Sequence, residues 1–168
     1  MSELQKIVVG IRSSNLSKSQ TNLLIQELLK QDPNLHKDVF NIKTIKTTGD
    51  VHNTHRLDQI GGKGLFIKEI EEQIISGKID IGVHSMKDVP TWLPDGTILP
   101  CNLIREETND VFICKKYKSL KDLPDGSVIG SASLRRCAQL LAMNPTFQCV
   151  NFRGNVQTRL KKIENGEY

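Results

Sequence analysis

The chain of 168 residues has few aromatic residues and no long apolar run. Phenylalanine, tryptophan and tyrosine make up 5% of it, too few for the stacking surface of a single-stranded nucleic-acid binder. No apolar run approaches the roughly 20 residues that cross a bilayer. The amino terminus also lacks the layout of a signal peptide. We therefore expect no nucleic-acid partner, no membrane contact and a cytosolic location.

Nucleotide and metal motifs are absent as well. The glycine-rich run at 61–64 lacks the complete phosphate-loop pattern, and no G-x-G-x-x-G run occurs. The four cysteines have no C-x-x-C spacing, which argues against a zinc site and against a redox motif. Cys101, Cys114 and Cys149 lie in apolar, strand-like runs, so we expect buried, reduced thiols there.

Acidic residues are missing between Ser127 and Ile163, although the net charge of the whole chain is only +4. A local field of one sign attracts anions even when a protein is only mildly basic. This part of the chain therefore favours an anionic ligand. Its basic residues are Arg135, Arg136, Arg153, Arg159, Lys161 and Lys162.

Strand-like and helical segments alternate along the chain, which predicts parallel sheets covered by helices. We place a first α/β domain at 1–103 and an incomplete second one at 104–168. Residues 48–64 show no sustained period and predict a long mobile loop. Strands are expected at 6–11, 39–47, 79–83, 128–130 and 147–152, extended segments at 97–105 and 110–114, and helices at 15–30, 65–76, 134–143 and 156–164.

Arginine occurs at three turns that join a predicted strand to a predicted helix: at Arg12, at the pair Arg135 and Arg136, and at Arg153. In an open α/β sheet, ligands bind beyond the carboxyl ends of the strands, where helix amino termini offer free N–H groups. The forked guanidinium donor matches a carboxylate or a phosphate. Together these turns predict a site for a ligand with several acidic groups.

Asp88 follows the apolar run 79–83, in the segment Val83–Pro90. One carboxylate among several arginines favours an acid–base group that serves a polyanionic substrate. The residue types alone leave open a turn or helix cap for Asp88 and a solvated surface position for each arginine. His84 favours a hydrogen-bonding role at a strand end, and Ser85 has no partner His and Asp that would make it a nucleophile.

Taken together, these segments resemble the porphobilinogen deaminase family, also called hydroxymethylbilane synthases. The similarity runs in order through nearly the whole chain, and the run 83–90 is its most specific part. The matching runs are 10–14, 48–50, 61–66, 83–90, 130–136, 152–159 and 165–168.

The resemblance implies a transferase of haem and tetrapyrrole biosynthesis that joins four porphobilinogen units into hydroxymethylbilane and releases ammonia at each step. It implies two type II periplasmic-binding-protein-like α/β domains, the second incomplete in this chain, and Asp88 as the catalytic carboxylate. It also implies a dipyrromethane cofactor and no metal. The implied carboxylate-binding residues are Arg12, Ser14, Lys87, Ser131, Ser133, Arg135, Arg136, Arg153 and Arg159, and Lys63 and Phe66 fall on the mobile loop.

The chain departs from the family because a third, carboxy-terminal domain is missing. That domain carries the cysteine to which dipyrromethane is attached, and none of the four cysteines here matches it. We therefore expect a truncated, amino-terminal fragment that is inactive alone, taken from an enzyme that is monomeric at full length. The alternative is a non-catalytic binding module for an acidic metabolite, which the same arginine turns would serve.

Overall fold

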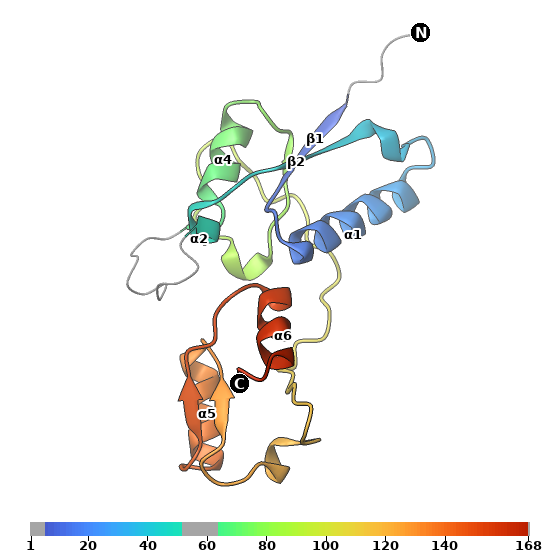
Figure 1. Cartoon of the computed structure of the whole chain (residues 1–168). Coiled ribbons are helices and arrows are strands. Elements are labelled where there is room, and N and C mark those ends of the chain that lie inside the picture. Colours follow the sequence, from blue (N-terminus) through green and yellow to red (C-terminus); the bar gives the residue numbers. More distant parts are fainter. Residues whose placement is uncertain (1–5, 52–63, 168) are drawn as a thin grey trace. The chain divides into compact units, whose positions relative to one another are not determined.

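The computed structural model describes residues 6–51 and 64–167, and the chain divides into two compact units between Ile104 and Arg105. Within the described residues, helices alternate with parallel strands, which confirms the predicted mixed α/β class (Figure 1). Each unit has a parallel sheet of its own. No helix in the described part of the chain is both long enough and apolar enough to span a membrane.

The sheet of the first unit has the strand order β2-β1-β3, so the first strand in the sequence is the central one. Both neighbours run parallel to it, and therefore all three carboxyl ends lie at one edge of the sheet. The elements of this unit are β1 (Ile7–Ile11), α1 (Asn15–Gln31), η1 (Lys37–Val39), β2 (Phe40–Thr44), α2 (Thr48–Val51), α4 (Lys68–Ile75), β3 (Ile81–Gly82) and η2 (Met86–Asp88).

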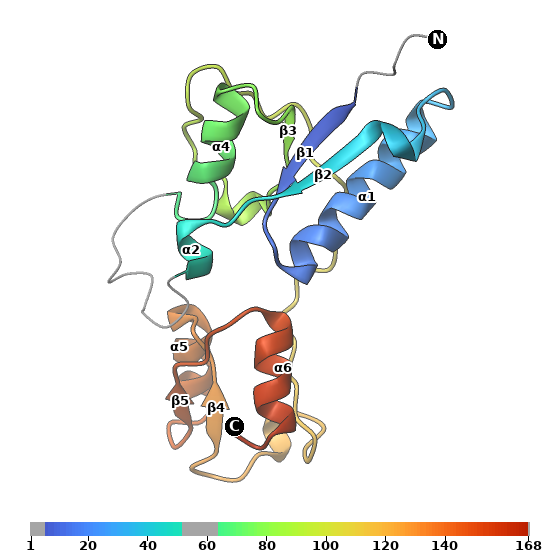
Figure 2. The same cartoon turned by 45° about the horizontal axis from the view of Figure 1, so that its top comes forward.

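The core of the first unit forms where α4 packs on the sheet. Ile70 of α4 is 0% exposed and clusters with Ile45 and Ile79, which lie just after β2 and just before β3. Helices α1 and α4 flank the strands, and both contact β1 (Figure 2). This packing fixes the sheet edge from which the turns after β1, β2 and β3 emerge.

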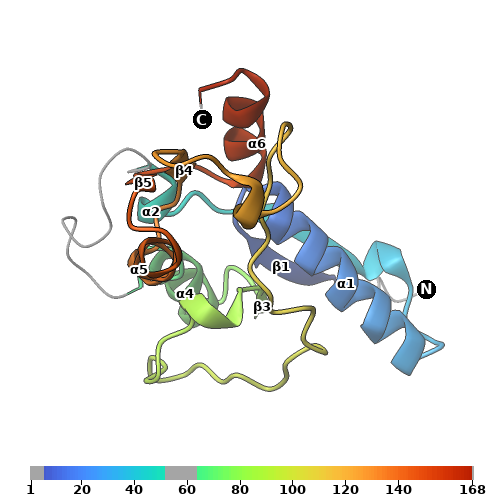
Figure 3. The same cartoon turned by 90° about the horizontal axis from the view of Figure 1, so that it is seen from below.

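The second unit is smaller and has a two-stranded parallel sheet, with α5 beside it (Figure 3). Among its described residues the buried apolar side chains are Phe147 and Phe152. The Phe152 ring packs against Gly130, where a Cβ would lie 2.7 Å from the ring, so this contact requires glycine. Its elements are η3 (Leu120–Asp122), β4 (Val128–Gly130), α5 (Leu134–Met143), β5 (Gln148–Val150) and α6 (Val156–Glu164).

The expected burial of two cysteines was wrong: Cys101 and Cys114 are exposed. They lie in the segments 97–105 and 110–114, which were predicted as extended and expose apolar side chains such as Ile104 and Val111. These segments pair with no strand among the described residues, so no sheet covers their side chains.

Other boundaries shifted. The predicted loop 48–64 begins with the short helix α2, and residues 52–63 lie outside the described residues. The predicted helix 65–76 begins only at Lys68, because residues 64–67 form a turn. The predicted strands 39–47, 79–83 and 147–152 are shorter in the structure.

Replacing Ile70 by alanine should destabilise the first unit by about 2–5 kcal/mol, because the fully buried side chain would leave a cavity. Ile75 lies on the same helix and is 56% exposed, so Ile75→Ala is the matched control and should change little. Urea unfolding of the two variants measures the difference. Equal losses in both would contradict the placement of this core.

Candidate functional site

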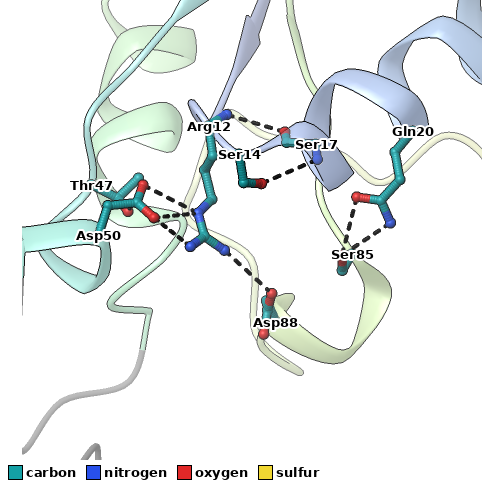
Figure 4. Close-up of polar contacts among 8 residues, drawn as sticks. All are labelled: Arg12, Ser14, Ser17, Gln20, Thr47, Asp50, Ser85 and Asp88. Carbon is teal, nitrogen blue, oxygen red and sulfur yellow. Dashed lines mark hydrogen bonds and ion pairs between the residues drawn. The ribbon is translucent and has the colours of Figure 1, made fainter. Parts of the chain in front are cut away.

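Arg12 directly follows β1 and is the centre of the polar cluster in the first unit (Figure 4). Its Nε donates to Asp50 Oδ1 at 3.2 Å, and its Nη2 donates to the same oxygen at 2.5 Å. Because two nitrogens of the planar guanidinium are engaged on one side, the group is fixed in orientation. Its remaining nitrogen, Nη1, faces Asp88, with 4.0 Å to Oδ2.

Asp50 comes from α2, just beyond the end of β2. Its Oδ2 also accepts a hydrogen bond from the fully buried hydroxyl of Thr47 at 2.8 Å. Burial alone would raise the pKa of Asp50, but the hydrogen bonds from Arg12 and Thr47 outweigh it and hold the pKa below its ordinary value. The Asp50 side chain is therefore a charged anchor for Arg12.

The aromatic ring of Phe66 lies beneath the guanidinium of Arg12, with 4.1 Å between the carbon of the guanidinium and the ring centroid. The ring in turn packs on Gly49, where any Cβ would overlap it. The backbone N–H of Gly49 donates to the carbonyl of Leu65 at 2.7 Å, which ties α2 to the turn that carries Phe66. Phe66, predicted to lie on a mobile loop, thus supports Arg12 by a cation–π contact.

Asp88 ends η2, the turn that follows β3, and its side chain is 23% exposed. His84 lies near the same carboxylate. Burial lowers the pKa of His84; Asp88 acts against this shift and Arg12 adds to it. A cavity of about 30 Å³ adjoins Arg12, Phe66, His84 and Asp88. This arrangement places an accessible carboxylate beside a fixed cation and a neutral imidazole, which suits the transfer or stabilisation of a proton.

Four further polar residues border this cluster. The hydroxyl of Ser14 caps α1 by accepting from the N–H of Ser17 at 3.2 Å, which leaves its own O–H free to donate. Gln20 and Ser85 form a reciprocal pair, with distances of 3.0 and 3.2 Å (Figure 4). Lys87 is exposed and lies on η2 next to Asp88.

In the second unit, Arg135 and Arg136 hold one carboxylate. Arg135 Nη2 lies 3.0 Å from Asp110 Oδ2, and Arg136 Nη2 lies 2.7 Å from Asp110 Oδ1. Hydrogen bonds from Arg136 and then Arg135 lower the pKa of Asp110. Although the two arginines are adjacent on α5, both reach the same anion. The pair therefore has the geometry of a carboxylate-binding site.

Ser131 and Ser133 shape the turn in front of this arginine pair. Ser133 caps α5 by accepting from the N–H of Arg136 at 3.4 Å, and the Ser131 hydroxyl accepts from the N–H of Ser133 at 3.2 Å. Both hydroxyls are used here as acceptors, so their O–H groups are available to donate to a ligand.

Arg153 and Arg159 lie around the start of α6. Arg153 follows the buried Phe152, two residues beyond the end of β5, and Asn155 caps α6 by accepting from the N–H of Thr158 at 2.8 Å. Arg153 Nη1 and Arg159 Nε are buried and have no hydrogen-bond partner within residues 6–51 and 64–167. Buried donors without a partner are costly, and they occur where a ligand supplies the missing acceptor.

The structure thus brings Arg12, Ser14, Phe66 and Asp88 to one edge of the first unit, and it groups Ser131 and Ser133 with Arg135 and Arg136 in the second. Lys63 lies outside the described residues.

Sequence reasoning missed several residues of these clusters. Asp50 had a usable signal, since it is an acid just beyond the end of a strand parallel to β1. No sequence signal pointed to Asp110, because it lies 25 residues from Arg135 in a segment without periodicity. Among the described residues, no three side chains of the metal-binding types gather into a cluster that could hold an ion.

Comparisons with known proteins point to one family. The family model described as porphobilinogen deaminase, dipyromethane cofactor binding domain, matches residues 7–168. The chain is 52% identical over 162 residues to a chloroplastic porphobilinogen deaminase of Oryza sativa subsp. japonica, covering 96% of the chain and 45% of the rice protein. It is 51% identical over 160 residues to the porphobilinogen deaminase of Clostridioides difficile (strain 630), covering 95% of the chain and 52% of that protein. The chain spans about half the length of the curated relatives it matches.

The Asp50→Asn variant should be less stable than the unmodified chain at neutral pH by about 1.5–3 kcal/mol, because Arg12 loses a charged partner. A carboxyl group whose folded pKa is lowered stabilises the fold at pH values above its ordinary pKa of 3.8, and this contribution is lost as the pH falls through the folded value. The stability difference should therefore shrink in acid. Urea unfolding at several pH values measures it, with the exposed Asp95→Asn as control. A difference that stays constant with pH would contradict the assignment.

The Asp110→Asn variant should bind a small dicarboxylate such as succinate about two- to fivefold more tightly, because the side chain that occupies the arginine pair loses its charge. Titration calorimetry measures the affinity. Glu107→Gln removes the same charge from a nearby exposed position and is the matched control. If the affinity rose equally in both variants, the cause would be the change in net charge. It would then not be the loss of the ion pairs between Asp110 and the two arginines.

Proposed function

The chain belongs to the porphobilinogen deaminase family, and we propose that it supplies the substrate- and cofactor-binding part of an enzyme that joins four porphobilinogen units into hydroxymethylbilane with release of ammonia. The observation that carries this proposal is the pairing of Asp88 with Arg12 at the carboxyl ends of β1 and β3. Because the chain spans about half the length of its relatives, the complete activity is proposed for the whole protein.

Asp88 is the proposed catalytic carboxylate. It accepts a hydrogen bond from a pyrrole N–H and stabilises the positive charge that develops on the ring when the aminomethyl group leaves as ammonia. Arg12 is held by Asp50 and Phe66, so its position beside Asp88 is fixed. Burial lowers the pKa of His84, which favours its neutral form beside Asp88.

The residues of the second unit fit a dipyrromethane group, whose acetate and propionate side chains are carboxylates. The buried donors Arg153 Nη1 and Arg159 Nε lack acceptors, and a ligand carboxylate would supply them. Arg135 and Arg136 already hold a carboxylate, that of Asp110. When bound, dipyrromethane supplies the pyrrole chain to which new units are joined. The residues proposed to hold acidic side chains are Arg12, Ser14, Lys87, Ser131, Ser133, Arg135, Arg136, Arg153 and Arg159.

The finer architecture is part of the same proposal. The parallel sheets with arginines at their carboxyl edges support two type II periplasmic-binding-protein-like domains, 1–103 and 104–168. Most of the predicted loop 48–64, including Lys63, lies outside the described residues. A monomeric full-length enzyme and a cytosolic location stay predictions.

Binding of porphobilinogen to the chain tests the ligand site. Arg153→Gln should weaken binding at least about tenfold, because a charged hydrogen bond to a carboxylate is lost. Titration calorimetry measures the affinity, and Arg105→Gln is the matched control because Arg105 is exposed in the same unit. No saturable binding, or equal losses in the two variants, would overturn the proposed site.

Ammonia release distinguishes the enzyme from a binding module. In a protein that carries this chain at the family's full length, Asp88→Asn should abolish release while the affinity for porphobilinogen stays nearly unchanged. A non-catalytic binder would take up porphobilinogen and release no ammonia even with Asp88 intact. Loss of binding in Asp88→Asn would instead make Asp88 a binding residue.

A further inference from the structure

Two cysteines that are distant in the sequence meet in the second unit. Cys137 lies in the first turn of α5, Cys149 lies in β5, and the helix packs on this strand. Cys149 Sγ donates to the backbone carbonyl of Cys137 at 3.9 Å, and Cys137 Sγ donates to the carbonyl of Ser131, also at 3.9 Å. Both thiols therefore belong to the contact between α5 and the sheet.

The Cys149 thiol lies against the backbone of Cys137, and the two thiols influence each other electrostatically. Burial, followed by a hydrogen bond and a charge interaction with the Cys137 thiol, raises the pKa of the Cys149 thiol. Both residues are half-buried, so small oxidants reach them, whereas Cys101 and Cys114 are exposed and lie outside this contact. The raised pKa of Cys149 predicts that its reaction quickens as the pH increases.

We propose that Cys137 and Cys149 are a redox modification site, at which a hydroperoxide or an exchanging disulfide converts the two thiols into one reversible intramolecular disulfide. The C-x-x-C criterion does not detect this pair, because the two cysteines belong to separate elements that the fold brings together.

The reaction balances with hydrogen peroxide as the oxidant. The thiolate of one cysteine attacks a peroxide oxygen, the O–O bond breaks, and a sulfenic acid and one water form once protons are transferred. The second thiol attacks the sulfenic sulfur, the S–S bond forms, and the sulfenic oxygen leaves as a second water. The two thiols together lose two electrons and two protons, which the peroxide takes up.

The disulfide would restrict the helical turn that carries Arg135 and Arg136. Cys137 directly follows Arg136, and its N–H donates to the carbonyl of the helix cap Ser133 at 3.0 Å. A link to β5 would therefore fix the first turn of α5 to the sheet. Formation of the disulfide would therefore affect how Arg135 and Arg136 bind a carboxylate, because all three residues share one helical turn.

Mass spectrometry of the oxidised chain tests the proposal. The chain is treated with a small excess of hydrogen peroxide, free thiols are alkylated, and the peptides are mapped. The expected product is a crosslinked peptide that joins Cys137 to Cys149 and disappears on reduction with dithiothreitol, while Cys101 and Cys114 are recovered alkylated. Recovery of Cys137 and Cys149 as alkylated thiols, or crosslinks mainly to Cys101 or Cys114, would overturn it.

Two controls separate the folded contact from random oxidation. In Cys149→Ser, Cys137 should give a sulfenic acid that dimedone traps, and no intramolecular crosslink should form. Cys101→Ser should leave the Cys137–Cys149 crosslink unchanged. In concentrated urea the selectivity for this pair should disappear, and the same product distribution with and without urea would show that the fold does not direct the bond.

Discussion

The ion pair between Arg12 and Asp50 joins the ends of two neighbouring parallel strands, and the polar cluster of the first unit depends on it. Arg12 follows the central strand, so its position is set by hydrogen bonds on both sides of β1. Asp50 and Phe66 then fix the plane of its guanidinium, which leaves one nitrogen facing Asp88. A lysine could not replace it, because a single ammonium group has no plane to orient.

In the second unit, polar residues also follow the ends of parallel strands, but the sheet is smaller. Its two strands are parallel, Ser131 and Ser133 follow one strand, and Arg153 follows the other. Two buried donors here, Arg153 Nη1 and Arg159 Nε, have no acceptor in the described part of the chain. Unpaired polar groups are expected at binding sites, because a donor that binds a ligand cannot at the same time donate to an acceptor of the protein. The proposed carboxylate ligand follows from this incomplete pairing.

Local signals predicted the helices well. The bounds of α5 and α6 match those predicted, and α1 begins at the predicted residue 15, with Ser14 as its cap. Helix starts depend on a capping side chain and on the spacing of apolar residues, both of which are local. The expected burial of Cys101 and Cys114 was wrong for the opposite reason. The apolar residues of their segments suit a strand, but pairing and burial depend on a partner elsewhere in the chain.

The sequence by itself determined which chemical groups stand at the strand-to-helix turns: arginines, serines and the carboxylate of Asp88. It also determined the alternation of strands and helices that places those turns at the edges of parallel sheets. Only the tertiary structure decided which groups meet, such as Arg12 with Asp50, Asp110 with the arginine pair, and Cys137 with Cys149. These contacts join residues far apart in the chain, so they depend on strand order, register and helix packing, which no local pattern encodes.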